Sequence, residues 1–574
     1  MNYNSNCWDL DKIKPKSLDH ELKEIELKTS KLEQKRTQLK SSIFPTNFLK
    51  LLQEFEQLKI QIGKVGVYTH LKFCENTLNQ KAVAEMSLVE NFLTRITNRL
   101  LFFSIWFKSL PAAKVNELIA QSGKYSYFLE VFKKNKPYTL KENEEKIINL
   151  KEITGVSALN NIYNLLTSQF EFTFQGKKRT QEEMVTYVRS SFAAVREEAY
   201  QTLFRPFVKN KQVLGEVYKN IVNDWKIENV DLRGYKNPLN VRNTANDLPD
   251  KAVEVLLKVC KKNQALFHRF FEIKRKKMGL KKMRRYDIYA PLKEEKEHIA
   301  YDKAVRMVLD TLENFSPELK KLAELIIQSN HVHSTVQAGK VSGAFCCSAG
   351  AKITPYVLLS YTGKYRDVST LAHELGHGIH YLLSSVQTEF TNSACLPLAE
   401  TASIFSEMLL SEKILQQNPK AAESIIFTKL DDLYASIIRQ AGFVEFEIKA
   451  HQMLQEGKTV DEISAVYLAD LRSQLGPKVE VNEIFANEWT YIPHIFHTPF
   501  YCYAYAFGNL LTLALYEVYK EQGNKFVPKF IKLLSLGGSA SPVEITKLVG
   551  VDIASEKFWQ KGFDVIERMI KEIT

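Results

Sequence analysis

The sequence predicts a mainly α-helical protein with a small β-sheet beside one helix that carries a candidate metal site. Apolar residues recur at helical spacing through most of the 574 residues, whereas the alternation typical of strands is confined to a few short runs. The third observation is His373-Glu374-Leu375-Gly376-His377, an H-E-x-x-H pattern with helix-forming neighbours. We therefore expect a large helical fold organised around this helix.

Composition and charge are those of an ordinary globular protein. Hydrophobic residues make up 45% of the chain and charged residues 25%, which is the usual balance. The net charge of +12 raises the question of nucleic-acid binding. However, the densest basic run, residues 274–285, has no interleaved aromatic residues and no zinc-knuckle or RNP-like motif. A solvated helix end explains this run, so we expect no nucleic-acid partner.

Cysteine usage and the N-terminus favour a cytoplasmic location. The seven cysteines show no C-x-x-C or disulfide-framework spacing, which suits a reducing compartment. Residues 1–6 lack the basic start and apolar run of a signal peptide. The most apolar run, residues 100–107, is too short to span a bilayer. We therefore expect no association with a membrane.

Residues 1–190 are expected to form an N-terminal helical region. Apolar residues recur at threes, fours and sevens from residue 17 to residue 61, and Pro45 and Asn47 break this pattern into two helices. Residues 170–181 begin with alternating aromatic and polar residues and turn at Gly176, as a short β-hairpin does. Helical periodicity covers three further stretches: 81–110, 114–132 and 142–166.

The H-E-x-x-H stretch has the spacing of a metal site. On a helix, His373 and His377 lie one turn apart on the same face, so both imidazoles can reach one metal ion. Glu374 is rotated to the side of that pair, where its carboxylate can meet a metal-bound water without displacing it. The motif also arises by chance, so its significance depends on a third ligand.

Residues 396–407 offer that ligand. Their apolar residues recur at helical spacing, and a catalytic zinc site typically takes three protein ligands and leaves a position for water. Glu400 can supply the third ligand from a neighbouring antiparallel helix. Glu407, two turns further along the same face, is placed to accept a hydrogen bond from a ligand imidazole. Standing alone, both residues would be read as solvated surface acids.

Two other residues compete for a place at the metal. His380 shares the face of His373 but lies about 10 Å further along the helix axis. We expect it to support the ligands by a hydrogen bond or to pack nearby, rather than to bind the ion. Cys395 is a possible thiolate ligand, although a single cysteine near a helix start is more often a small buried apolar residue.

Two strand-like runs precede the metal helix, residues 341–347, which are rich in small side chains, and residues 356–361. In metalloproteases an extended peptide often pairs with a sheet edge near the metal, because backbone hydrogen bonds hold it without reading its side chains. Gly343, Ala344 and Phe345 are therefore candidate substrate-binding residues. A plain buried hairpin explains these runs equally well.

Residues 489–508 are unusually rich in aromatic residues and histidine. Tyr501 and Tyr505 are four apart and would share a helical face, with His494 or His497 on the preceding turn. Phenol and imidazole groups aimed at a developing oxyanion would supplement a metal ion. Aromatic helix starts also occur as ordinary core packing.

Taken together, these motifs resemble those of the oligoendopeptidase F branch of the thimet oligopeptidase family of zinc metallopeptidases. The similarity covers most of the chain from residue 150 onward, whereas residues 14–111 share only a helical pattern. Beyond H-E-L-G-H and the Glu400 segment, the matching motifs are Trp8-Asp9-Leu10, Ile153-Thr154-Gly155, Arg233-Gly234-Tyr235, Arg242-Asn243, residues 286–292, residues 342–346, Tyr361-Thr362-Gly363, Pro499-Phe500-Tyr501 and residues 536–539.

The resemblance implies a large helical metallopeptidase of the zincin type with a deep substrate cleft. Residues 1–190 would form a wall of that cleft, and residues 191–574 the catalytic region. One Zn²⁺ per chain and oligopeptide substrates are implied, in a monomer or a simple homo-oligomer. The implied roles are zinc ligands for His373, His377 and Glu400, general base for Glu374, and transition-state donors for His494, Tyr501 and Tyr505, with His497 or Tyr503 as alternatives.

Cleavage of internal peptide bonds in short, unstructured peptides is the activity that the resemblance implies. A metallo-carboxypeptidase of similar helical fold is the main alternative. A helical scaffold with a structural zinc site is disfavoured, because a closed site needs a fourth protein ligand and His380 and Cys395 are the best candidates for it.

Overall fold

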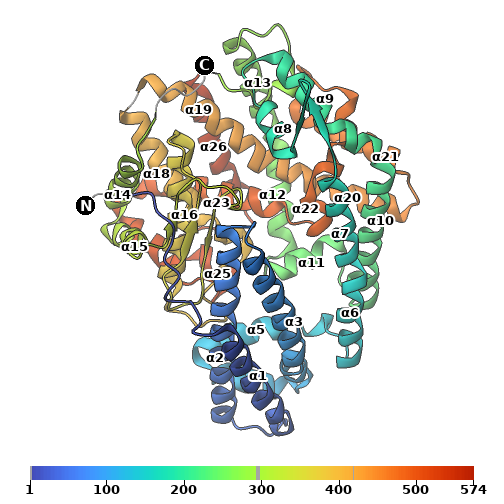
Figure 1. The fold of residues 1–574 in the computed structure, drawn as a ribbon, viewed down its shortest axis with the longest axis vertical. Coiled ribbons are helices and arrows are strands. Elements are labelled where there is room, and N and C mark those ends of the chain that lie inside the picture. The colour runs from blue at the N-terminus through green and yellow to red at the C-terminus, as the bar shows by residue number, and fades with distance from the viewer. Residues whose placement is uncertain (1–2, 293–297, 418) are drawn as a thin grey trace. The chain divides into compact units, whose positions relative to one another are not determined.

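The protein is mostly helical, as expected. Its structure, a computed structural model, describes residues 3–292, 298–417 and 419–574 (Figure 1). Helices take up 72% of the chain, and the strands of the described residues form three small sheets. No helix in these ranges combines the length and apolar character that a membrane span requires.

The chain packs as two compact units, each assembled from three separate stretches. Unit 1 contains residues 1–146, 297–413 and 518–551, and unit 2 contains residues 147–296, 414–517 and 552–574. The expected division at residue 190 and the deep cleft stay predictions. Three helices contribute residues to both units: α6 (Glu142–Thr154), α18 (Thr401–Gln417) and α23 (Tyr503–Gln522).

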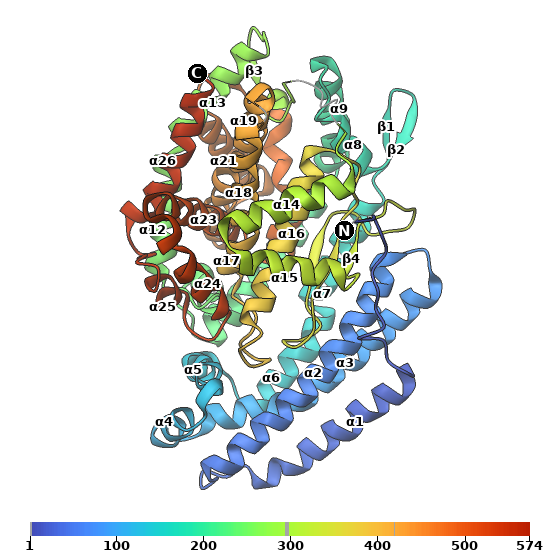
Figure 2. The same ribbon diagram turned by 90° about the vertical axis from the view of Figure 1, so that its left-hand side faces the viewer.

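Unit 1 begins with three long helices that pack side by side (Figure 2). Ser17 caps the first by accepting a hydrogen bond from the His20 amide, and Pro45 starts the second, where the sequence predicts a break. The described helices of unit 1 are α1 (Leu18–Gln34), α2 (Pro45–Glu75), α3 (Gln80–Ser109), α4 (Ala112–Ala120), α5 (Ser126–Lys134), α14 (Tyr301–Phe315), α15 (Pro317–Gln328), α16 (Tyr365–Ser384), α17 (Leu396–Ala399), α24 (Val527–Ser535) and α25 (Pro542–Lys547).

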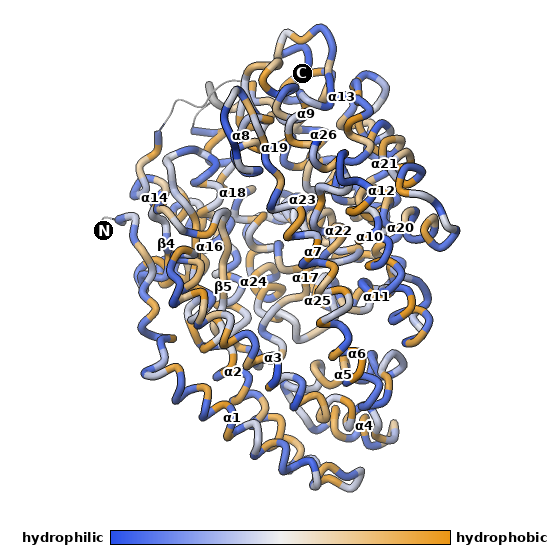
Figure 3. The backbone as a smooth tube through the Cα atoms, turned by 45° about the vertical axis from the view of Figure 1, so that its right-hand side comes forward, coloured by the Kyte–Doolittle hydropathy of each residue, from blue (hydrophilic) through white to orange (hydrophobic). Residues whose placement is uncertain are grey.

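Apolar stripes hold the first three helices together. Hydrophobic and hydrophilic stretches alternate along α1 and α2 in Figure 3, and the hydrophobic ones are buried between neighbours. Phe55 and Phe103 meet with ring centroids 4.6 Å apart, and Phe48 stacks on Phe107 at 5.8 Å. Each such aromatic pair adds about 0.5–1.5 kcal/mol beyond the area it buries.

The sheet of unit 1 lies against the metal helix α16. Its order is β4-β6-β5: β4 (Val332–His333) pairs parallel to β6 (Tyr356–Leu358), and β5 (Phe345–Cys347) pairs antiparallel to it. Both expected strands are therefore present but shorter than predicted. Gly343 takes a φ of +88°, which only glycine adopts at little cost, so the chain is not extended there.

Unit 2 contains the predicted hairpin. Strand β1 (Phe172–Phe174) pairs antiparallel with β2 (Lys177–Arg179), and β3 (Met283–Arg284) pairs parallel with β7 (Val479–Glu480). The described helices of unit 2 are α7 (Val156–Ser168), α8 (Gln181–Tyr187), α9 (Ala193–Lys209), α10 (Lys211–Trp225), α11 (Pro238–Ala245), α12 (Asp250–Lys262), α13 (Gln264–Lys277), α19 (Pro419–Leu433), α20 (Arg439–Gln455), α21 (Val460–Leu475), α22 (Pro493–His497) and α26 (Glu556–Glu572).

Candidate metal centre

Helix α16 presents His373 and His377 on one half-buried face. Asp367 starts the helix by accepting hydrogen bonds from the backbone amides of Thr362 at 2.7 Å and Lys364 at 3.2 Å. On the opposite side, Leu371 and Leu375 are fully buried. The apolar face therefore fixes the rotation of the helix, and that rotation turns the two imidazoles toward the Glu400 segment.

Gly376 lets that segment come close. A Cβ at this position would lie 2.6 Å from the Cα of Ser403 and 2.7 Å from the Ala402 carbonyl oxygen. Both are backbone atoms, so no side-chain rotation could relieve the contact. The glycine inside the H-E-x-x-H motif is thus a packing requirement of the site.

The predicted helix over residues 396–407 is interrupted at Glu400. Helix α17 ends at Ala399 and α18 starts at Thr401, while Glu400 has ψ near −2° instead of a helical value. The interruption leaves the Glu400 side chain half-buried beside the two histidines.

Three ligand-type atoms converge at this point. His373 Nε2 and His377 Nε2 are 3.2 Å apart, and Glu400 Oε2 lies 3.3 Å from the first and 3.4 Å from the second. In tetrahedral coordination with metal–ligand bonds of about 2.0–2.1 Å, the ligand atoms lie about 3.3 Å from one another. The three spacings therefore fit a zinc-sized ion with one position left open.

Hydroxyl and carboxylate groups hold the ligands in place. Glu407 Oε1 lies 2.6 Å from His373 Nδ1 and accepts a hydrogen bond from it, which turns Nε2 toward the other two ligand-type atoms. Ser369 donates to the other Glu407 oxygen at 3.0 Å, and Ser403 donates to Glu400 Oε2 at 2.8 Å. Neither serine could be identified from the sequence, since serine is common on helices and has no characteristic spacing.

The electrostatics of the centre favour positive charge. Burial acts to lower the pKa of His373, but the carboxylates of Glu400 and Glu407 raise it to about 10. Burial likewise acts to raise the pKa of Glu400, yet the two imidazoles hold it well below its usual range. A cation placed between these three groups would be stabilised by the same carboxylate charge.

Glu374 is a buried carboxylate next to the centre. It is 5% exposed, and its Oε2 atom has no hydrogen-bond partner among the residues that the structure describes. Burial raises its pKa above the usual value, and the nearby imidazoles of His373 and His377 oppose that shift. Such a group accepts a proton more readily than an exposed carboxylate does.

The two competing residues do not join the centre. Within the described part of the chain, the metal-type group contains His373, His377 and Glu400, without His380 or Cys395. Burial lowers the pKa of His380 to about 4, and the ring hydrogen-bonds the backbone of Ala399. It therefore supports the segment that carries Glu400, in line with the packing role expected from its distance along the helix.

The predicted donor residues form a cluster of their own in unit 2. Tyr505 Oη lies 3.3 Å from His494 Nε2, and the Tyr501 and Tyr505 rings meet edge-on with centroids 5.1 Å apart. The alternatives point elsewhere: His497 Nε2 lies 3.0 Å from Asn164 Oδ1, and the hydroxyl of buried Tyr503 accepts from Asn246 at 2.7 Å. The structure thus brings together His494, Tyr501 and Tyr505.

A strained turn presents Tyr501. Phe500 has a φ of +58°, a left-handed conformation that costs a bulky residue free energy. The buried carboxylate of Glu447 accepts from the Phe500 amide at 2.8 Å, and Arg242 Nε donates to the Pro499 carbonyl at 3.0 Å. Glu447 carried no sequence signal, because its partner lies far along the chain.

The predicted substrate-binding residues lie at the sheet edge beside α16. A Cβ on Gly378 would be 3.7 Å from Cys346 Sγ, so β5 and the metal helix are in close contact. Since β6 lies between β4 and β5, the outer side of β5 is a sheet edge. Gly343, which is exposed, and Ala344 lead into this edge, and Phe345 is its first strand residue.

Comparisons with known proteins found matches along most of the chain. A family model described as Peptidase family M3 matches residues 186–565, and one described as Oligopeptidase F matches residues 106–172. An oligoendopeptidase F homolog from Borreliella burgdorferi is 27% identical over 96% of this chain and 94% of its own length. The oligopeptidase PepF of Bacillus subtilis is 25% identical over 89% of this chain and 79% of its own length.

Solved structures share the fold. A protein from Chlamydophila abortus superimposes with a TM-score of 0.87 at 24% identity, covering 99% of this chain and 97% of its own. The oligoendopeptidase-F of Enterococcus faecium gives a TM-score of 0.73 at 20% identity, covering 97% and 99%. The arrangement of helices is therefore one already seen in crystals.

Proposed function

This chain belongs to peptidase family M3, and on that premise we propose that it is a zinc-dependent oligoendopeptidase that cleaves internal bonds of short, unstructured peptides. The observation that carries the proposal is the triangle of His373 Nε2, His377 Nε2 and Glu400 Oε2, with sides of 3.2–3.4 Å. A relative named oligoendopeptidase F homolog matches this chain over nearly the whole length of both proteins.

The three ligands suit one Zn²⁺ at this centre. Two imidazoles and one carboxylate are the donor set of many catalytic zinc sites, which keep a further position for water. When bound, the ion supplies a charge that acidifies water and polarises the scissile carbonyl. The 2.6 Å hydrogen bond from His373 Nδ1 to Glu407 keeps His373 Nε2 turned toward His377 and Glu400, where the ion would bind.

Glu374 acts as the general base. Its buried Oε2, which has no hydrogen-bond partner among the described residues, accepts a proton from the attacking water, and the carboxyl group then delivers that proton to the leaving amine nitrogen. Glu374 does not need to bind the metal for this task, since His373 and His377 on the same helix supply metal ligands.

His494, Tyr501 and Tyr505 donate hydrogen bonds to the oxyanion that forms at the scissile carbonyl. Their rings already lie together, with Tyr501 and His494 stacked at 6.0 Å. Phenol and imidazole donors that are held in place before the reaction lose little order when charge develops, which is why such groups lower the barrier.

The β5 edge holds the peptide substrate. An extended chain can pair with the backbone at Gly343, Ala344 and Phe345, which leaves the substrate side chains mostly unread. The proposal also includes a reducing, cytoplasmic location, because the seven cysteines, all of them within the described residues, form no disulfide with one another.

Mass analysis of cleavage products tests the function. A peptide blocked at both ends should be cut at internal bonds by the wild-type chain, and a chelator should abolish the cuts. Removal of single residues only from a free C-terminus would instead indicate a metallo-carboxypeptidase. Cleavage that persists undiminished after metal removal would refute the proposal.

A further inference from the structure

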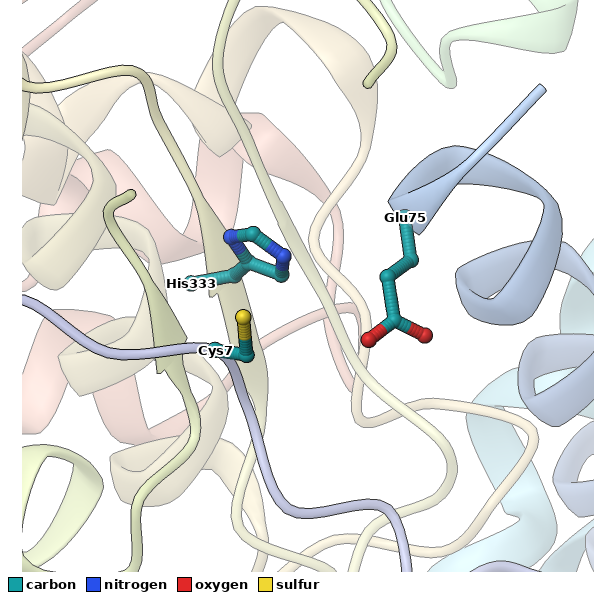
Figure 4. Close-up of side chains that lie close together, drawn as sticks. All are labelled: Cys7, Glu75 and His333. Carbon is teal, nitrogen blue, oxygen red and sulfur yellow. The ribbon is translucent and has the colours of Figure 1, made fainter. Parts of the chain in front are cut away.

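A second group of metal-type side chains lies away from the centre described above. Cys7, Glu75 and His333 each offer a ligand atom, and these atoms all lie within 4.8 Å of one another. Figure 4 shows that they come from three elements: the N-terminal segment, the end of α2 and strand β4. All three elements belong to unit 1.

His333 has a ring nitrogen without a role in the fold. The residue is fully buried, and its Nε2 atom has no hydrogen-bond partner within the described ranges. Its Nδ1 atom makes only a long contact, 3.4 Å, with the Thr335 hydroxyl. An unpaired buried polar atom costs about 1–3 kcal/mol, so a structure that retains one calls for a ligand or another explanation.

Backbone hydrogen bonds hold the three elements in register around the group. Asp9 N donates to Asn330 O at 2.7 Å and Ser334 N donates to Asn6 O at 2.9 Å, so Cys7 is pinned on both sides beside β4. Trp8 packs edge-on against the His333 ring, with centroids 5.2 Å apart.

The end of α2 is fastened in the same way. Val341 N donates to Cys74 O at 2.9 Å and Thr77 N donates to Gly339 O at 2.7 Å. In addition, the Gln337 side chain donates to the Glu75 carbonyl at 2.7 Å. The ligand-type side chains are thus carried by segments that backbone hydrogen bonds hold to one another.

We propose that Cys7, Glu75 and His333 form a second metal site, which takes a thiophilic divalent ion such as Zn²⁺ and fastens the N-terminal segment to β4. Thiolate, imidazole and carboxylate are all zinc ligands, and the thiolate gives this site a softer character than the histidine-carboxylate centre. Binding displaces the Cys7 thiol proton to solvent. It also gives the orphaned His333 nitrogen a partner.

Two neighbouring lysines set the cost of binding. Lys72 Nζ lies 2.5 Å from Glu75 Oε2, so an ion must use the other carboxylate oxygen or displace this partly exposed pair, which contributes little. Lys340 donates to three backbone carbonyls, those of His333, Thr335 and Leu359, at 2.7–3.1 Å. These bonds hold the ammonium in place near the site.

Cobalt binding by the full-length chain tests the proposal. Co²⁺ bound to a thiolate gives a sulfur-to-metal charge-transfer absorption, which cobalt at His373, His377 and Glu400 cannot give. Titration of the reduced metal-free protein should therefore produce this band, with about two ions bound per chain. Cys7→Ser should remove the band and one ion, and His333→Ala should weaken binding at this site at least tenfold.

A matched control removes a different thiol. Cys74→Ala deletes the buried thiol next to Glu75 but leaves all three proposed ligands, so the band should persist at full intensity. Circular dichroism confirms that each variant is folded. The proposal is overturned if wild-type protein shows no charge-transfer band, or if Cys7→Ser retains it; either result leaves the peptidase proposal intact.

Discussion

The two metal-type groups of unit 1 differ in how the chain builds them. His373, His377 and Glu400 come from one continuous stretch, and Glu407 and the two serines hold them from the same stretch. Cys7, Glu75 and His333 come from three distant parts of the sequence and meet only through tertiary hydrogen bonds. Local sequence spacing therefore predicts the group of His373, His377 and Glu400, whereas the group of Cys7, Glu75 and His333 can be identified only from the folded structure.

Burial also separates the two groups. At the first centre the Glu407 carboxylate hydrogen-bonds Nδ1 of the His373 imidazole, and the buried carboxylate of Glu374 belongs to the next residue of the same helix. At the second, the His333 imidazole is fully buried with the Thr335 hydroxyl 3.4 Å from its Nδ1, and Cys7 is exposed. The first arrangement matches the proposed activation of water, whereas the second matches the proposed fastening of one segment to another.

The largest effect should come from the base. Glu374→Gln keeps the shape of the side chain but cannot accept a proton, so kcat should fall about 10²–10⁴-fold while the bound zinc is retained. Steady-state kinetics with a quenched peptide and metal analysis of the same sample check this. Turnover close to wild type would remove Glu374 from its proposed role.

Loss of a phenol donor should come next. Tyr501→Phe should lower kcat about 10²-fold with little change in KM, because the hydroxyl is used mainly in the transition state. Tyr503→Phe is the matched control, since that hydroxyl bonds Asn246 in the core. Equal kcat values for the two variants would show that the cluster in unit 2 plays no part in catalysis.

Loss of the hydrogen bond between Glu407 and the His373 imidazole should have a moderate effect on zinc affinity. Glu407→Gln should weaken zinc binding about 10–100-fold, because His373 loses the charge that fixes its proton on Nδ1. Competition with a chromophoric chelator measures this affinity. Glu412 lies on the same helix and pairs with Lys520, so Glu412→Gln should leave the affinity unchanged.

One added methyl group at Gly376 should push α16 and α18 apart. Gly376→Ala should lower the free energy of unfolding by about 1–3 kcal/mol and reduce zinc affinity, because its Cβ meets backbone atoms at 2.6–2.7 Å. Gly378→Ala would meet chiefly the end of the Ile326 side chain, which can rotate. Denaturant unfolding should therefore find Gly378→Ala the more stable of the two.

The smallest effect should come from the second group. At a free zinc concentration ten times the dissociation constant of that site, bound metal should add about 1.4 kcal/mol to the free energy of unfolding. Cys7→Ser should lack this increment in zinc titrations followed by thermal unfolding. An identical zinc response in both proteins would contradict a fastening role.

The helical fold and the grouping of His373, His377 and Glu400 could be predicted from the sequence because both depend on local periodicity. The i, i+4 spacing of His373 and His377 and the apolar pattern around them predict one helical face. The break at Glu400 could not be predicted, since a single residue leaving helical geometry does not disturb an apolar pattern. The role of Gly376 depends on Ser403, which is a contact between segments rather than a spacing.

Other features stayed hidden for the same reason. Glu447 supports the turn at Phe500 from another helix, so neither residue indicates the other in the sequence. The shortening of β5 follows from the positive φ of Gly343, and a run of small residues does not reveal which glycine turns. Packing between distant segments decided each of these features.

Zinc content of a single pair of variants tests the central claim most directly. Cys7→Ser leaves the His373, His377 and Glu400 centre as the metal site of the chain, and Glu400→Ala added to it removes one of the three ligands. Elemental analysis after dialysis should find about one zinc per chain in the first protein and almost none in the second. One zinc per chain in the folded double variant would contradict the proposed metal centre.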